Sequence, residues 1–186
     1  IAQLEWIEKH QRKFKSRIRP ANLEFVSGES LYFRGKVHKL EVRYKESKPC
    51  ILIDGEIIVL YARPGSNLEK RKKILNEWYR KILKKQIPEL INKWAPLVGG
   101  CPVDWGVKNM KTRWGSCNTN TKKIWISLKL AEKSTPCLEY VVVHEMVHLL
   151  ERGHGKFFKA HMDRVLPDWR STRNELNSSI YSKVER

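Results

Sequence analysis

The first third of the chain shows short runs in which hydrophobic and polar residues alternate. Between residues 23 and 62 these runs are LEFV, LYFR, VHKLEVRY, CILID and EIIVLY, and Gly28, Gly35 and the pair Asp54-Gly55 separate them. Alternation with a period of two is typical of half-buried strands, and Asp-Gly favours a tight hairpin turn. The pattern predicts a small antiparallel sheet.

The period then changes to that of a helix. After a turn cluster at residues 63–67, the segment LEKRKKILNEWYRKILKKQI carries Leu75, Trp78 and Ile82 at helical spacing with a charged opposite face. Eight basic residues and one acid, Glu77, lie between residues 70 and 85. This predicts an amphipathic basic helix whose outer face is either a solvated surface or a surface for polyanions. Pro88 predicts a kink or an end, before the turn-rich APLVGGCP.

Strand character returns at residues 102–130. VDWGVKNM, TRWGSC and, after the polar turn NTNTK, KIWISLKL predict a second sheet or an extension of the first. Thr135 and Pro136 then resemble an N-cap followed by proline at the first helical position, which predicts a helix that runs to about Arg152.

The predicted helix contains the most apolar part of the second half of the chain, yet it is rich in ionisable side chains. VVVHEMVHLLERGH, residues 141–154, carries three histidines and two glutamates. Positions four apart lie on one helical face, so His144 and His148 can hold one metal ion while Glu145 lies beside it. This is the HExxH pattern of zinc peptidases. Its alternative is a pair of ordinary histidines, but burying unpartnered imidazoles and a carboxylate is costly.

A catalytic zinc site needs a third protein ligand. His154 is the leading candidate because Gly153 and Gly155 flank it and permit a sharp reversal after the helix. Asp168 and Glu175 are alternatives at longer separation. Zinc would activate a water molecule for attack on a carbonyl carbon, with Glu145 as the general base. Arg113 and Tyr140 are the candidates for stabilising the oxyanion.

Several motifs resemble the YgjP-like metallopeptidases, which are similar to the SprT-like and WLM zinc peptidases. They are MKTRWGSC (110–117), WISLKLA (125–131), EYVVVHEMVHL (139–149), GHGKFF (153–158) and LPDW (166–169). The resemblance implies a zincin-like α+β domain, an HExxH helix packed on an antiparallel sheet, with His144, His148 and His154 as zinc ligands and Glu145 as acid and base. Lys159 departs from the family, which commonly has an aromatic residue there.

Peptidases of this type bind an extended substrate along the edge of a sheet. KIWISLK, the last strand before the metal helix, is the candidate edge, which makes Trp125, Ile126 and Ser127 candidate substrate-binding residues; the alternative is an ordinary covered strand. In TRWGSC, Trp114 is expected to plug the core and Gly115 to permit close backbone approach. Cys117 is either an inert small side chain or a thiol near the metal.

The predicted organisation has two parts. Residues 1–66 comprise a basic N-terminal helix over residues 1–19 and the β-rich lobe, and residues 67–186 form the zincin-like peptidase domain, with or without a shared core. The four cysteines form no CxxC pair and are expected to be free thiols in a reducing cytoplasm. No apolar run is long enough to cross a membrane.

The sequence carries a formal net charge of +17, which favours contact with polyanions such as DNA or is simply a solvated surface. The prediction is a zinc-dependent endopeptidase that acts on polypeptides in the cytoplasm, and its narrower version adds recruitment to nucleic acid through the basic surface. The alternative from another class is a non-catalytic nucleic-acid-binding module with a structural zinc. A metal-dependent hydrolase of small amides is a third reading.

Overall fold

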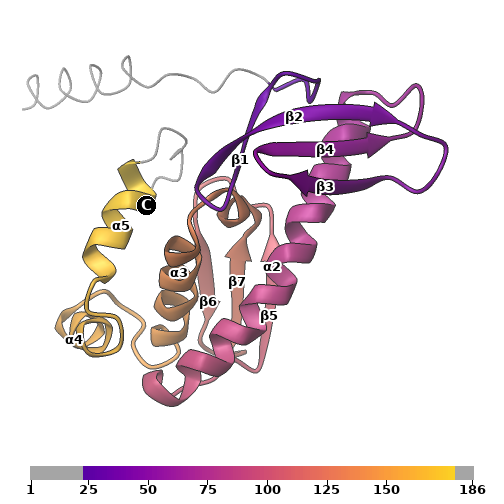
Figure 1. Cartoon of the computed structure of the whole chain (residues 1–186). Coiled ribbons are helices and arrows are strands. Elements are labelled where there is room, and N and C mark those ends of the chain that lie inside the picture. The colour runs from indigo at the N-terminus through magenta and orange to yellow at the C-terminus, as the bar shows by residue number, and fades with distance from the viewer. Residues whose placement is uncertain (1–22, 179–186) are drawn as a thin grey trace, which may run out of the picture.

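A computed structural model describes residues 23–178 of the chain. The predicted basic helix at residues 1–19 lies outside this range. The described residues form two small sheets, a long helix that runs beside both, and three shorter helices that follow the second sheet (Figure 1). This is the α+β architecture that the sequence predicts.

The first sheet contains β1 (Ser30–Phe33), β2 (Lys36–Tyr44), β3 (Cys50–Asp54) and β4 (Ile57–Ala62), in the order β1-β2-β4-β3. The hairpin at Asp54-Gly55 is confirmed. The sheet is mixed, however, because β2 and β4 pair in parallel, and the run LEFV is not a strand. Ile58, Val59 and Leu60 are all buried, and this continuous apolar run suits β4 to a central position between β2 and β3.

Helix α2 (Leu68–Val98) is longer than the pattern predicts, since it continues through Pro88 and Pro96. Its buried residues follow one stripe along the helix: Leu75, Tyr79, Leu83, Ile87, Ile91, Trp94 and Val98. Because this stripe extends past both prolines, tertiary packing outweighs the backbone hydrogen bonds that they remove. The helix begins at the Asn67 cap and ends at Gly99, whose φ of 82° only glycine adopts readily.

The second sheet contains β5 (Asp104–Lys108), β6 (Gly115–Asn118) and β7 (Lys123–Ser127), in the order β5-β7-β6. It too is mixed rather than purely antiparallel, because β5 pairs with β7 in parallel. Strand β7 is therefore central, and the prediction that KIWISLK is the free edge is wrong. The residues after it also leave the sheet: Leu128–Glu132 is a 3-10 helix, η1.

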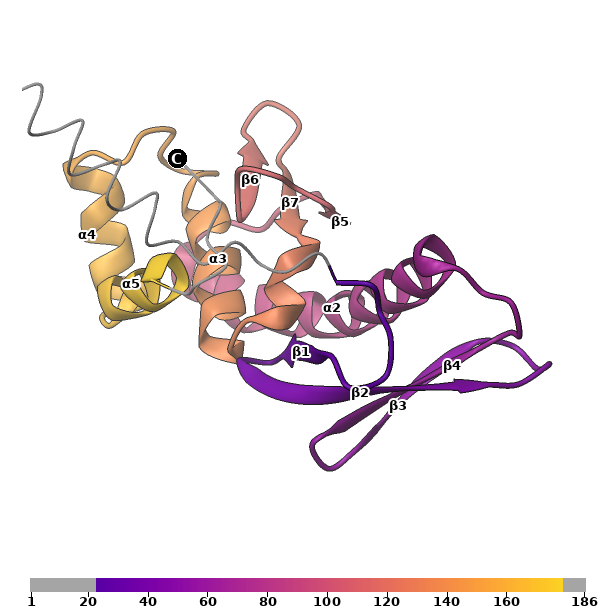
Figure 2. The ribbon, with the colours of Figure 1, turned by 90° about the horizontal axis from the view of Figure 1, so that it is seen from above.

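Helices α3 (Thr135–Val147), α4 (Lys156–Val165) and α5 (Trp169–Ser178) complete the described part. Helix α3 lies between the second sheet and α2 on one side and α4 and α5 on the other (Figures 1 and 2). Its buried position explains why it is apolar nearly all round, since every side meets another element.

One hydrophobic core contains residues from both sheets and from α2 to α5. The predicted boundary at residue 66 falls between β4 and α2. Across that boundary the backbone N–H groups of Arg34 and Gly35 donate to the carbonyl oxygens of Ala131 and Glu132 in η1.

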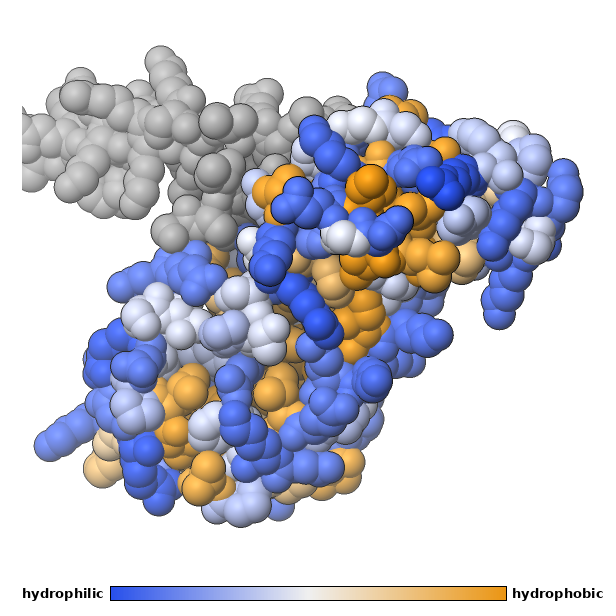
Figure 3. Space-filling model, in the orientation of Figure 1, coloured by the Kyte–Doolittle hydropathy of each residue, from blue (hydrophilic) through white to orange (hydrophobic). Residues whose placement is uncertain are grey.

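Apolar side chains of the first sheet also reach the surface at Leu52 and Ile57, and Figure 3 shows apolar surface in this part of the molecule. In residues 23–178 no helix is long and apolar enough to span a bilayer.

Candidate metal centre

Helix α3 holds the first two histidines of the predicted site. Its N-cap is Ser134 rather than Thr135, and Pro136 lies in the first turn, where a missing N–H costs nothing. The helix ends at Val147, well before the predicted Arg152, and His148 is its C-cap residue. The chain therefore turns immediately after the second histidine, and the turn carries His154 back towards the helix.

The structure brings the three histidines together. The Nε2 atom of His154 lies 3.0 Å from Nε2 of His144 and 3.1 Å from Nε2 of His148. The potential ligand atoms of the three side chains all lie within 4.8 Å of one another. Among residues 23–178 they form the one group of at least three side chains that could hold a metal ion. Nitrogen ligands of one tetrahedral zinc ion lie roughly 3.3 Å apart. The cluster thus has the spacing that a single ion requires.

In His144 and His148, the ring nitrogen outside the cluster, Nδ1, makes a contact that orients the imidazole. Nδ1 of His148 lies 2.9 Å from the carbonyl oxygen of Glu151, and Nδ1 of His144 lies 3.4 Å from the hydroxyl of Tyr140. A carbonyl oxygen can only accept, so Nδ1 of His148 is the protonated nitrogen, and the Nε2 lone pair faces the cluster. A second hydrogen bond of this kind fixes ring orientation at metal sites.

Phe158, on α4, packs against all three imidazoles. Its ring centroid lies 4.9, 4.7 and 4.8 Å from those of His144, His148 and His154, and its side chain is 2% exposed. Phe158 belongs to the GHGKFF motif, from which no role at the site is predicted. The available signal was the apolar stripe of Phe158, Met162 and Val165 on α4, which turns Phe158 inward directly after His154.

The electrostatics favour neutral imidazoles. Burial, and after it the charges of the neighbouring His148 and His154, lower the pKa of His144 to about 3. Burial and the charge of His148 also lower the pKa of His154. Only an unprotonated imidazole can donate a lone pair to a metal. The donor set, three imidazole nitrogens beside a cavity, suits zinc or a similar divalent ion.

Glu145 lies next to the cluster and is 5% exposed. Burial raises the pKa of its carboxyl group to about 8, and the positive charge of Arg113 opposes that rise. Gly115, at the start of β6, faces the carboxylate so closely that the predicted close backbone approach is confirmed. A buried carboxyl group with a pKa near neutrality is suited to exchange protons at physiological pH.

These groups line a cavity of about 880 Å³ between β6, α3, α4 and α5. Arg113 and Tyr140 line it, as do Cys117 and Lys159. Trp125, Ile126 and Ser127, the predicted substrate-binding residues, do not. Ile126 and Ser127 are fully buried in the central strand, and the Trp125 ring covers Gly106 on β5. The strand that borders the cavity is β6, an edge strand of its sheet.

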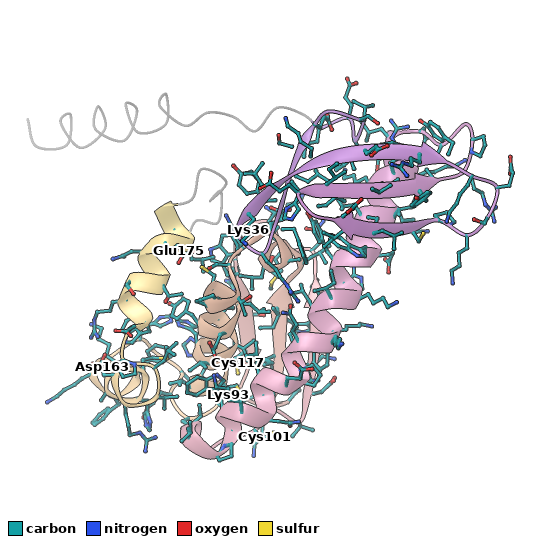
Figure 4. All side chains as sticks on the ribbon, viewed as in Figure 1. Lys36, Lys93, Cys101, Cys117, Asp163 and Glu175 are labelled. Atoms are coloured by element: carbon teal, nitrogen blue, oxygen red, sulfur yellow. The ribbon has the colours of Figure 1, made fainter. Side chains whose placement is uncertain are left out.

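The two alternative ligands, Glu175 and Asp168, make contacts outside the histidine cluster. The Glu175 carboxylate accepts a hydrogen bond of 2.7 Å from the hydroxyl of Ser134, and Figure 4 shows Glu175 on α5 towards the end remote from α4. Asp168 precedes α5, where its carbonyl oxygen accepts from the N–H groups of Ser171 and Thr172. Neither belongs to the histidine cluster.

The known proteins to which the chain is similar are metallopeptidases. The family model of the YgjP-like metallopeptidase domain matches residues 1–179. No curated protein matches the chain. The solved structures similar to it include the metallopeptidase zymogen of Pyrococcus abyssi abylysin, with a TM-score of 0.46 and 15% identity over 50% of this chain and 92% of that one. The zymogen of Methanocaldococcus jannaschii jannalysin has a TM-score of 0.43 and 18% identity over 48% and 92% of the two chains.

The α+β fold and the family match define the class of this protein as a metallopeptidase. The chain belongs to the YgjP-like family, whose model covers nearly all of its length.

Proposed function

We propose that this protein is a zinc-dependent peptidase in which His144, His148 and His154 hold the metal and Glu145 is the general base. The observation that carries the proposal is the convergence of three Nε2 atoms beside the buried carboxyl group of Glu145. A zinc ion bound there would lower the pKa of water and polarise a carbonyl group.

The chain's own residues supply the remaining steps. The Glu145 carboxylate accepts the proton of the attacking water and later transfers it to the leaving amine. Its burial raises the carboxyl pKa to about 8, near neutrality, which suits a group that both accepts and releases a proton. Tyr140 and Arg113 line the same cavity and are the candidates for stabilising the oxyanion.

Cleavage inside a polypeptide is supported by the edge strand β6. The strand pairs with β7 along one side, and Gly115, Ser116 and Cys117 line the cavity. An extended peptide can add to a free strand edge through main-chain hydrogen bonds, which do not depend on its sequence. This arrangement favours an endopeptidase over a hydrolase of small amides.

The decisive test compares wild type with Glu145→Gln and His154→Ala, using casein as the substrate and metal analysis of the purified proteins. Glu145→Gln should retain bound zinc and lose turnover, whereas His154→Ala should lose both. The reference variant is His161→Ala, because His161 lies on α4 outside the cluster. Full activity of Glu145→Gln would refute the assignment of the base.

A structural zinc in a non-catalytic binding module is the rival function. Structural sites usually have four ligands and are rich in cysteine. Here three histidines form the cluster, and Cys117 lines the cavity without belonging to it. A metal that resists exchange and a casein assay without activity would favour the rival.

Recruitment to nucleic acid is supported by a second groove, of about 910 Å³, between the first sheet and the N-terminal half of α2. Trp78, Ile74 and Ile51 line it as apolar residues. Its cationic residues are Lys48, Arg63, Lys70, Lys73 and Lys81, and the acid beside them, Glu77, is paired with Arg80. Cations around an aromatic floor are typical of surfaces that bind single strands.

This recruitment is tested by the salt dependence of binding to single-stranded and duplex DNA. Neutralising several phosphates predicts a steep loss of affinity as salt rises. Lys73→Gln combined with Lys81→Gln should weaken binding, while Lys84→Gln, on the same helix but outside the groove, should not. Absence of binding at low salt would remove the proposal.

A reducing, cytoplasmic location is supported by the cysteines. Cys50, Cys101, Cys117 and Cys137 are all free thiols, as the sequence predicts. Free thiols persist where disulfides are kept reduced. Fractionation of cells that express the full protein tests the location, and recovery with an oxidising compartment would contradict it.

A further inference from the structure

The charged side chains around the candidate metal centre are strongly unbalanced. The cationic residues that line the cavity are Arg113, Arg152, Lys159 and Arg173, whereas Glu145 is the carboxylate that lines it among residues 23–178. Within the same residues none of these four cations is joined to a carboxylate, and Arg152 donates to the neutral amide of Asn120. Cations without counter-charges in a concave site concentrate anions.

Two of the arginines lie beside residues that contact the centre, on different elements. Arg113 lies just before β6, two residues from Gly115, whose backbone lies against Glu145. Arg173 lies on α5 with its guanidinium carbon 5.7 Å from the ring centroid of Trp169, which stacks on Tyr140 beside His144. Strand β6 and helix α5 lie on opposite sides of α3 (Figure 1). A bound chain that passes the histidines therefore has an arginine on each side.

We propose that this centre selects peptides that carry a carboxylate next to the bond to be cleaved, and that Arg173 binds this carboxylate. The inference rests on the peptidase function proposed above. A guanidinium group presents parallel N–H donors that match the two oxygens of a carboxylate. The carboxylate has two possible sources, an Asp or Glu side chain of the substrate or the C-terminus of the cleaved chain.

The arrangement of the cations favours a single carboxylate over a nucleic-acid strand at this site. A phosphodiester backbone repeats its charge and is matched by a row of cations, as in the groove along α2. Around the histidines, Arg113 and Arg173 come from separate walls of the cavity, the segment before β6 and helix α5. They can contact residues on either side of one peptide bond.

The kinetic test uses fluorogenic peptides of one sequence, with Glu or Gln beside the scissile bond and with a free or an amidated C-terminus. We expect kcat/KM to be about tenfold higher for the carboxylate, the size of one partly exposed charged hydrogen bond. Preference for Glu in amidated peptides identifies a side-chain carboxylate, and preference for the free terminus identifies the chain end. Arg173→Gln should abolish the preference mainly through KM.

The matched control is Arg170→Gln. Arg170 lies on the same helix, pairs with Asp163 and does not line the cavity, so its replacement should leave the preference unchanged. Charge reversal in Arg173→Glu should transfer the preference to peptides with Lys at the same position. A new preference for Lys peptides is not expected from a variant that is merely misfolded or destabilised.

A binding measurement separates this inference from the peptidase function. Fluorescence anisotropy of labelled Glu and Gln peptides with Glu145→Gln protein measures the preference without turnover. If wild type cleaves neither peptide but binds the Glu peptide more tightly through Arg173, the peptidase function fails and carboxylate selection stands. Equal affinities and equal kcat/KM for the two peptides would overturn the inference. A competition experiment gives a second check. If a single-stranded oligonucleotide displaces the labelled peptide at a lower concentration than unlabelled Glu peptide does, and this depends on Arg173, the inference is overturned.

Discussion

The backbone of Gly115 lies directly against the side chain of Glu145. A Cβ atom on Gly115 would come within 2.6 Å of Oε1, 2.7 Å of Cγ and 2.9 Å of Cδ of Glu145. The glycine is needed for space rather than for backbone conformation, because the carboxylate is buried and occupies the position of the missing side chain. Strand β6 thereby holds the proposed base beside the histidines.

Gly115→Ala is predicted to displace the carboxylate of Glu145 and to lower kcat by more than about tenfold, since misplacing a catalytic group by about 1 Å can cost about a hundredfold. Zinc content should stay at the wild-type level, because the three histidines are not touched. Steady-state kinetics and metal analysis check both parts. Gly100→Ala is the reference variant, since its new Cβ meets only ordinary contacts of 3.5 Å or more. Normal kcat in Gly115→Ala would contradict the positioning role.

Cys101 is predicted to react faster than Cys117 and Cys137. Burial, and after it the charge of Glu145, raise the pKa of Cys117 to about 11. Burial likewise raises the pKa of Cys137 to about 11, whereas Cys101 is exposed. Because the thiolate is the reactive form, iodoacetamide at pH 8 should modify Cys101 well before the other two. Cys101 lies in the loop before β5 and Cys117 on β6 (Figure 4), and tryptic sites between them allow peptide mass spectrometry to follow each one. Rapid alkylation of Cys117 would show that its environment is more open.

Glu139 joins α3 to the C-terminal half of α2. Its Oε1 atom accepts hydrogen bonds from Nζ of Lys93 at 2.7 Å and from Nε1 of Trp94 at 2.9 Å. Glu139→Ala leaves the largely buried indole N–H unpaired and is predicted to lower the free energy of unfolding by about 2 kcal/mol. Urea denaturation measures the change. The control is Glu89→Ala, at an exposed position of α2, which should alter the free energy of unfolding by less than about 0.5 kcal/mol. An equal loss in both variants would mean that the bridge contributes nothing specific.

Glu132 is predicted to make stability depend on pH. Burial raises its pKa above the ordinary value of 4.5, and Lys133 and Lys129 only partly oppose this. Between the ordinary and the raised pKa the folded state holds a proton that the unfolded state has lost, so stability falls as pH rises through that interval. Glu132→Gln removes this contribution and should stabilise the protein more at pH 7 than at pH 4. Thermal unfolding across this range tests the sign, with Glu89→Gln as the control. A stabilisation by Glu132→Gln that is larger at pH 4 than at pH 7 would refute the prediction.

Local signals in the sequence were sufficient for much of the candidate site. The HExxH spacing placed His144 and His148 on one helical face, and the glycines around His154 indicated the reversal that brings it to them. Asp54-Gly55 marked the hairpin between β3 and β4 for the same reason, since a two-residue turn depends on its own residue types. These predictions succeeded because each depends on neighbours in the chain.

Predictions that depended on distant partners were less successful. KIWISLK was expected to be an edge strand, but the alternation of its residues reports only that one face is buried, not which strands pair on either side. The prolines at 88 and 96 indicated a break in α2, but the core on which the helix packs is assembled from other segments, and it keeps the helix intact. Phe158 and Arg173 likewise had no predicted role, and the close approach predicted for Gly115 had no predicted partner, because nothing in their own sequence neighbourhoods identifies the side chains that they meet.

The sequence by itself determined the helical histidine pair, the carboxylate between them and the turn that supplies a third imidazole, because helical periodicity and glycine conformations act over a few residues. The tertiary structure alone decided which strand borders the cavity, how deeply Glu145 is buried and which cations surround it. Burial and charge at a point in space are sums over segments that are far apart in the chain, and their values exist only once the chain is folded.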